Sequence, residues 1–172
     1  MNHTDSFDAL VAVTDAALVV VTTAAGGERA GCLVGFHGQA GIEPPFYSVW
    51  LSKANHTYRV SLEAEFLAVH FLTIDDHAWA ERFGTTSGED HDKFAGLDIV
   101  DGPGGIPLLA GLPHRIVARR VALLDVGADH VCVALAVEST HGTGGFSPLR
   151  LSAESALSPG HEAAERAVPP QG

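Results

Sequence analysis

Residues 29–58, RAGCLVGFHGQAGIEPPFYSVWLSKANHTY, alternate between segments that favour strands and segments that end them. Residues 29–36 and 46–51 are rich in apolar and aromatic side chains and predict two strands. A Gly-rich turn that closes with Glu43-Pro44-Pro45 separates them, because proline cannot donate to a strand ladder. Polar residues gather in the loop after the second strand: Ser52, Lys53, Asn55, His56 and Thr57. The stretch therefore predicts a loop that offers backbone donors, hydroxyls and one ammonium to a flat, anionic ligand.

The length and composition indicate one domain. The chain has 172 residues, of which 46% are hydrophobic, enough for one well-buried core. We expect this domain to cover residues 1–157, and residues 158–172 to form a disordered or loosely attached tail of Pro, Ala and Glu. Lys and Arg total 10 against 21 Asp and Glu, and the net charge of −11 argues against nucleic acid or an anionic membrane as partner. A phosphate-bearing small molecule needs only a local cradle of donors.

The cysteines and the apolar runs indicate a cytoplasmic protein without a membrane span. The N-terminal residues MNHTDSFDAL lack the basic start and apolar core of a secretory signal. The longest apolar runs, such as residues 16–21, are far shorter than the ~20 residues that a membrane span needs. Cys32 and Cys132 stand apart in different predicted strands, which favours two reduced thiols over a disulfide.

The remaining pattern predicts short helices among many strands. Ser6 is the expected N-cap of a helix over residues 7–13, and Thr73 with Asp76 is expected to cap a helix that runs to about Phe83. Further strands are expected over residues 17–23, 66–72, 115–125, 130–139 and 146–151, with a Gly26-Gly27 hairpin after the first and a turn-rich bridge over residues 107–111. Six or seven strands joined by tight turns predict a mainly β protein, a closed or half-closed antiparallel barrel.

Several residues have a structural alternative to a functional role. The loop over residues 52–57 is also what an ordinary Ser/Asn helix cap looks like, and His130 is also typical of a solvent-facing residue at the start of a strand. His70 lies within a strand and is expected to be a hydrogen-bonded core or interface residue. His91 lies in an acidic EDHD run that predicts a solvated loop, so no metal site is expected. Rossmann, P-loop, zincin and α/β-hydrolase motifs do not occur.

A series of short motifs follows one another along residues 7–151. They are Val20-Val21-Thr22-Thr23, residues 31–37 leading to Glu43-Pro44-Pro45, Asn55-His56-Thr57, residues 66–72 (FLAVHFL), Lys93-Phe94, Pro107-Leu108-Leu109 and Ala128-Asp129-His130. In this order and at these distances the chain resembles the flavin-reductase-like, FMN-binding split-barrel family, the short-chain NAD(P)H:flavin reductases of two-component monooxygenases. The chain also departs from the family pattern. Leu33, Gly35 and Phe36 replace hydroxyl residues, His37 replaces an aromatic residue, and Ala128 replaces a glycine.

The resemblance implies a split barrel that transfers hydride from NAD(P)H to FMN or FAD. It implies that His130 is catalytic, orienting the nicotinamide or the flavin. The residues that it implies for cofactor binding are Cys32, Leu33, Val34, Gly35, His37, Ser52, Lys53, Asn55, His56, Thr57 and Lys93. Lys53, Asn55 and Thr57 would hold the phosphate, and the strand backbone would contact the ring. A homodimer and a partner monooxygenase are also implied. The alternatives are a non-catalytic flavin, deazaflavin or haem binding protein of the same fold, and a purely structural domain.

Overall fold

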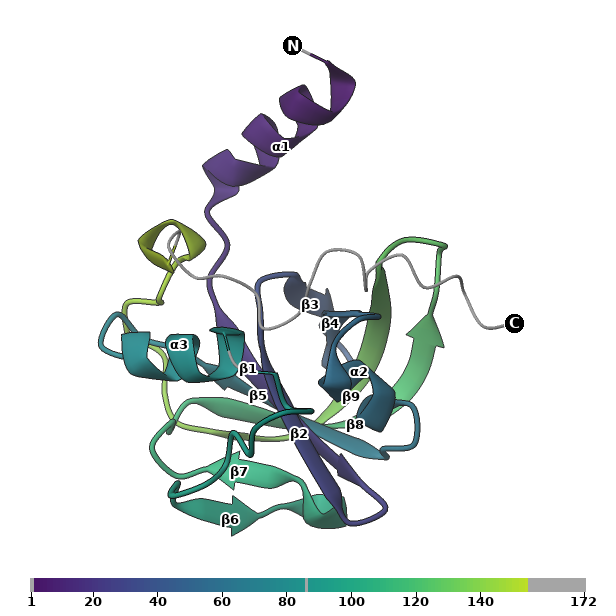
Figure 1. Ribbon diagram of the computed structural model, residues 1–172, viewed down its shortest axis with the longest axis vertical. Coiled ribbons are helices and arrows are strands. Elements are labelled where there is room, and N and C mark those ends of the chain that lie inside the picture. Colours follow the sequence, from purple (N-terminus) through teal and green to yellow (C-terminus); the bar gives the residue numbers. More distant parts are fainter. Residues whose placement is uncertain (1, 86, 155–172) are drawn as a thin grey trace.

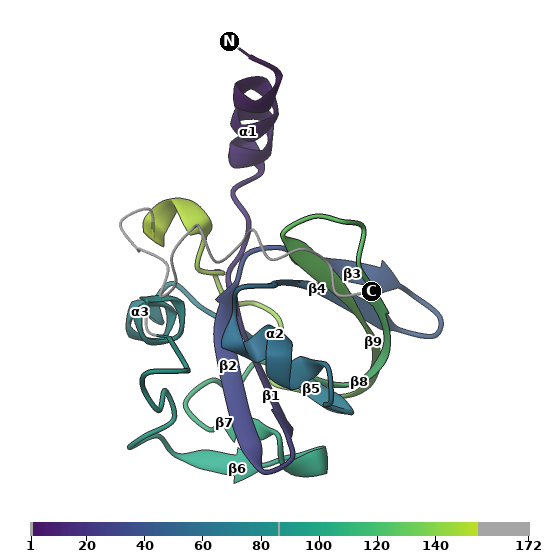
Figure 2. The same cartoon turned by 45° about the vertical axis from the view of Figure 1, so that its right-hand side comes forward.

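The computed structural model describes residues 2–85 and 87–154, so the expected tail over residues 158–172 lies outside the described residues. An antiparallel seven-stranded sheet curls into a half-open barrel, with the strand order β2-β1-β5-β8-β9-β4-β3 (Figures 1 and 2). Its strands are β1 (Val19–Ala25), β2 (Glu28–Val34), β3 (His37–Gly41), β4 (Phe46–Ser52), β5 (Phe66–Phe71), β8 (Arg115–Leu124) and β9 (His130–His141). The helices are α1 (His3–Thr14), α2 (His56–Ser61) and α3 (His77–Thr85). This arrangement confirms the predicted antiparallel split barrel.

The hairpin between β1 and β2 forms because two glycines occupy its turn. Gly26 and Gly27 have φ angles of 58° and 81°, which lie in the left-handed region that favours glycine. Their turn sets Ala25 opposite Glu28 and Val21 opposite Cys32. The predicted hairpin is therefore confirmed, and it places β2 at the outer edge of the sheet.

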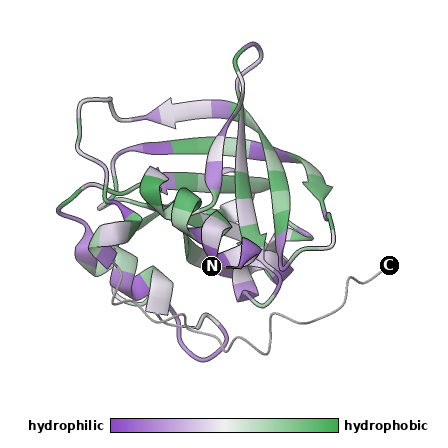
Figure 3. Cartoon of the chain, turned by 90° about the horizontal axis from the view of Figure 1, so that it is seen from above, coloured by the Kyte–Doolittle hydropathy of each residue, from purple (hydrophilic) through white to green (hydrophobic). Residues whose placement is uncertain are grey.

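The strand β1 buries both of its faces. Val19 and Val21 lie in the cluster inside the barrel, with Cys32 and Val34 of β2. Val20 points the other way, into a second cluster that contains Phe83 of α3. Because neither face meets solvent, β1 opens with an unbroken apolar run over residues 19–21 instead of an alternating pattern. Apolar residues run along the curved strands in Figure 3.

His70 of β5 links three segments of the core. Its side chain is fully buried, its Nδ1 donates to the carbonyl of Val20 at 3.1 Å, and its Nε2 accepts from the amide of Leu109, also at 3.1 Å. Burial lowers the pKa of His70 to about 4, so the ring is neutral at neutral pH. The expectation of a hydrogen-bonded core histidine is confirmed.

Four of the local predictions are wrong. Residues 37–41 of the predicted Gly-rich turn form β3, which pairs with β4. The predicted bridge over residues 107–111 contains β7 (Pro107–Leu109), which pairs with β6 (Ile99–Asp101) in a small second sheet. Residues 146–151 make only isolated bridges, at Pro148 and Arg150. Asn2, and not Ser6, caps α1, because its side chain accepts from the amide of Asp5.

The helix α1 projects from the barrel and buries none of its side chains (Figure 1). Only its base is fixed, because the Asp15 carboxylate accepts from both the amide and the hydroxyl of Ser152, at 2.8 and 2.6 Å. Phe7, Leu10 and Val13 are exposed. Among the described residues, no helix is long and apolar enough to cross a membrane.

Candidate functional site

The sheet brings two of the predicted site segments together at one end of the barrel. Strands β4 and β9 pair so that Ser52 lies opposite His130. The amide of Lys53 then donates to the carbonyl of Asp129 at 2.9 Å. The start of the predicted phosphate loop therefore lies beside the predicted catalytic histidine, although about eighty residues of chain separate them.

His130 is held between a carboxylate and an aromatic ring. Its Nδ1 lies 2.9 Å from Oδ1 of Asp129, so this nitrogen carries the hydrogen and Nε2 faces away from the carboxylate. The ring of Phe36 lies 4.9 Å from the His130 ring, centroid to centroid, tilted by 54°. The His130 side chain is 24% exposed. The histidine can therefore reach a ligand through one nitrogen while the other is fixed.

The ammonium of Lys53 is already paired. Its side chain is only 6% exposed, and Nζ lies 2.9 Å from Oδ1 of Asp125. The same oxygen accepts from the amide of Gly127 at 2.9 Å, and these two contacts hold the pKa of Asp125 below its usual value. A phosphate at Lys53 would have to compete with this carboxylate.

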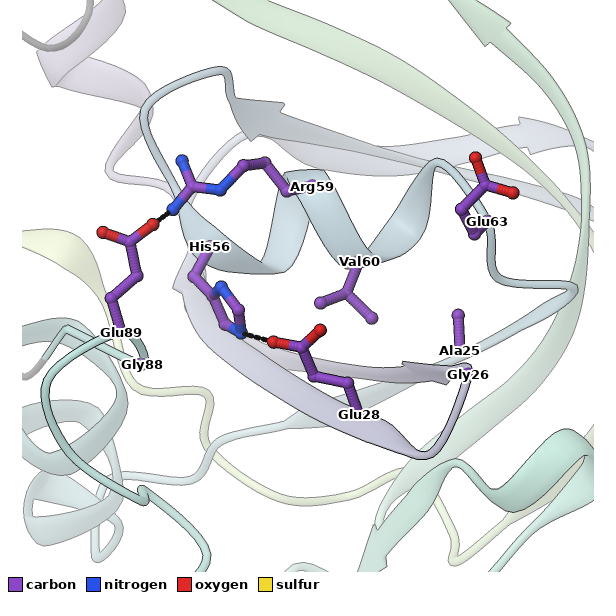
Figure 4. A pocket seen from close by; sticks show the side chains of 9 residues that line it. All are labelled: Ala25, Gly26, Glu28, His56, Arg59, Val60, Glu63, Gly88 and Glu89. Carbon is purple, nitrogen blue, oxygen red and sulfur yellow. Dashed lines mark ion pairs between the residues drawn. The ribbon is translucent and has the colours of Figure 1, made fainter.

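Asn55 and Thr57 also have structural contacts in the loop. The Asn55 side chain caps α2 by accepting from the amide of Thr57 at 2.9 Å. The Thr57 side chain is fully buried beside the thiol of Cys32, whose pKa is raised by burial. The helix cap that the sequence left open as an alternative is thus present. The His56 side chain points from α2 toward Glu28 (Figure 4).

A hollow of about 630 Å³ lies between α2, the β1–β2 hairpin and Gly88-Glu89. On its wall, Nε2 of His56 lies 3.0 Å from Oε1 of Glu28, and Arg59 forms an ion pair with Glu89 (Figure 4). Gly88 packs so closely that an added Cβ would lie 3.1 Å from the His56 ring. Sequence reasoning missed Arg59, although a basic residue one helical turn after His56 is a readable signal.

Strand β2 lies at the edge of the sheet and turns main-chain groups outward. The carbonyl of Gly31 points away from β1, since it accepts from Nζ of Lys93 at 2.9 Å. Backbone groups alternate along an antiparallel strand, so Leu33 also directs its N–H and C=O outward. The side chains of Cys32 and Val34 point into the barrel instead. At Leu33 this edge offers main-chain groups to a ligand, and nearer the hairpin it carries the exposed side chains of Glu28 and Arg29.

Lys93 is buried in the interior. Its Nζ donates to the carbonyls of Gly31 and Phe83, at 2.9 and 3.1 Å, and burial lowers the pKa of the ammonium. His37 is also engaged, because Nε2 donates to the carbonyl of Ala17 at 2.6 Å and Nδ1 accepts from the Tyr47 hydroxyl at 2.7 Å. Burial lowers the pKa of His37.

The comparisons with known proteins agree with a half-open barrel of this kind. A solved flavin reductase domain protein from Arthrobacter superposes with a TM-score of 0.75, at 18% identity over 85% of this chain and 89% of that one. The FMN reductase (NADH) SmoA of Agrobacterium fabrum is 28% identical over 80% of this chain and 76% of its own length. HsaB of Rhodococcus jostii, the reductase subunit of a flavin-dependent monooxygenase, is 26% identical over 66% of this chain. The chain spans 56% of the length of HsaB.

The fold defines a split-barrel protein in which polar side chains gather where β4 ends and β9 begins. The model of the flavin reductase like domain matches residues 14–153, most of the chain. The chain belongs to this family.

Proposed function

We propose that the protein is an NAD(P)H-dependent flavin reductase that transfers hydride to FMN or FAD. The observation that carries the proposal is the meeting of His130, Ser52 and Phe36 at one barrel end, next to the open edge of β2. Family membership supports it, and so does the naming of SmoA as an FMN reductase that uses NADH. When bound, the nicotinamide and flavin supply the redox chemistry, and the protein supplies placement.

The described residues provide the three parts that a flavin site needs. The outward main chain at Leu33 supplies a donor and an acceptor for the polar edge of the ring. Phe36 supplies an exposed apolar face. The loop over residues 52–57, extended by Arg59, supplies donors for a phosphate. His130 acts as the orienting residue, with its Nε2 turned to the ligand because Asp129 fixes Nδ1.

A non-catalytic flavin, deazaflavin or haem binding protein of the same fold is the second candidate. It is favoured by Leu33 and Gly35, which have no hydroxyl to offer a ring. The ion pair of Lys53 with Asp125 favours it too, because it weakens the case for a strongly held phosphate at that residue.

The partners and the location extend this proposal. We propose a homodimer that passes reduced flavin to a separate monooxygenase, as the naming of HsaB as a reductase subunit suggests. The cytoplasmic location stays a prediction, in keeping with Cys32 and Cys132 as free thiols.

An absorbance spectrum and a turnover assay test the proposal. Protein purified without added cofactor is titrated with FMN, FAD and riboflavin, and NADH and NADPH oxidation is followed at each flavin concentration. Flavin-dependent oxidation well above the rate without protein is expected. Flavin binding without oxidation would favour the non-catalytic candidate, and no binding of any flavin would overturn both.

A further inference from the structure

The donors of the hollow beside α2 are both covered by carboxylates from other parts of the chain. His56 and Arg59 come from α2, one helical turn apart. Glu28 comes from the start of β2 and Glu89 from the segment after α3 (Figure 4). The hollow is lined by three carboxylates, with Glu63 as the third, against one guanidinium. It therefore repels a phosphate while both covering contacts are in place.

The His56 ring is held in place, whereas Arg59, 46% exposed, and the two carboxylates have room to move. The His56 side chain is 16% exposed and is packed against Gly88. The side chains of Glu28 and Glu89 are 61% and 50% exposed. Ion pairs between such exposed groups are weak. An incoming phosphate carries more charge than a carboxylate and can displace Glu28 and Glu89 into solvent.

We propose that Glu28 and Glu89 set the affinity for flavin phosphate by competing with it for His56 and Arg59. This inference rests on the proposed function. It addresses whether the flavin is a diffusible substrate or a tightly held cofactor. With the competitors in place, phosphate binding is weak and the flavin exchanges, as a diffusible substrate and product. Without them, the same donors would hold the phosphate as they would hold that of a resident cofactor.

The test compares flavins with and without a phosphate in variants that remove the competing carboxylates. Dissociation constants of FMN and riboflavin are measured by fluorescence quenching for the unmodified chain, Glu28→Gln, Glu89→Gln and the double variant. We expect the double variant to bind FMN about three- to tenfold more tightly, because each exposed pair is worth a few-fold in affinity. Riboflavin affinity should change less than about twofold, since it has no group to compete.

Two controls separate the contacts from the general charge of the hollow. Glu63→Gln removes one negative charge from the same wall, as each single variant does, but Glu63 pairs with neither donor. Its effect on FMN affinity should therefore be much smaller than that of Glu28→Gln or Glu89→Gln. Adding Arg59→Ala to the double variant should abolish the gain. The proposal is overturned if the double variant binds FMN no more tightly, if riboflavin gains equally, or if Glu63→Gln gives the same gain. Failure of every variant to bind any flavin would overturn the proposed function itself.

Discussion

Lys53 and Asp125 tie the end of β4 to the turn that follows β8, with Nζ and Oδ1 at 2.9 Å. The Lys53 amide makes a second link to this turn through the carbonyl of Asp129. Lys53 can thus have one of two roles, which a binding measurement distinguishes. It either exchanges Asp125 for a ligand phosphate or serves as a fixed brace of the barrel end.

Lys53→Ala distinguishes these roles. If Lys53 holds phosphate, the charge-assisted contact is worth roughly 1.5–3 kcal/mol, so FMN should bind the unmodified protein about 10- to 100-fold more tightly than riboflavin. The variant should lose much of that difference and keep its riboflavin affinity. Calorimetric titration with both flavins checks this. Equal weakening of both flavins, or equal binding of both by the unmodified protein, would assign Lys53 to the brace.

His130→Ala should lower turnover about 10- to 100-fold, because loss of the orienting ring misplaces the reacting groups by about an ångström. The histidine contacts Asp129 and Phe36 at the surface, so the melting temperature should change little. Steady-state NADH oxidation and a thermal melt are measured together. An unchanged rate would make His130 an ordinary solvent-facing residue.

His70 should make the fold sensitive to mild acid. Its pKa in the folded state is about 4, below the ordinary 6.5, so the fold favours the neutral ring. The stability from this preference is fully present above pH 6.5 and is lost as the pH falls from 6.5 towards 4. The loss should approach roughly 3 kcal/mol. Urea unfolding at stepped pH measures it, and His70→Gln should flatten the dependence in this window; the same slope in the variant would contradict the assignment.

Gly31→Ala should destabilise the protein by about 1–3 kcal/mol, because the new Cβ crowds a packed site. It would lie 2.9 Å from Phe83 and 3.2 Å from Phe94. Gly38→Ala is the matched control, since it lies in β3 with no atom within 4 Å of an added Cβ. Denaturant midpoints of the two variants should therefore differ clearly, and similar midpoints would refute the packing argument.

A homodimer is expected at low micromolar concentration. The apolar strand over residues 67–72 is largely covered by the chain's own clusters. The structural reason to expect a dimer is α1, a 12-residue helix that buries none of its side chains. Leu10 and Val13 of this helix are 73% and 83% exposed. Such a helix is marginal alone in water and gains from a cover. Light scattering that gives only monomer mass would count decisively against the dimer.

The sequence could predict those features that depend on local chemistry. Apolar runs and Gly26-Gly27 predict β1, β2 and their hairpin, because conformational preference and register act within a few residues. The strand β3 was missed because Gly38 and Gly41 look like turn residues, and only pairing with β4 makes them a strand.

Contacts between distant segments could not be predicted in this way. The Lys93-Phe94 motif predicts a site residue, whereas the carbonyl that Lys93 contacts belongs to Gly31, 62 residues away in the sequence and in the interior. Glu28 precedes α2 in the sequence by 28 residues and Glu89 follows it by about as many. The residues next to His56 and Arg59 in the sequence therefore do not indicate that these two side chains form ion pairs.

The burial of both faces of β1 has a consequence for how the protein tolerates substitution. A strand with one wet face accepts polar residues at every second position, and a saturation library shows that period of two. In β1, Val19 and Val21 fill the barrel while Val20 fills the outer cluster, so adjacent positions should reject polar residues equally. The last four residues of β9, from Glu138 to His141, are exposed and should tolerate nearly anything. Variation among natural sequences of this chain should accordingly concentrate at that end of the barrel and leave residues 19–21 uniformly apolar.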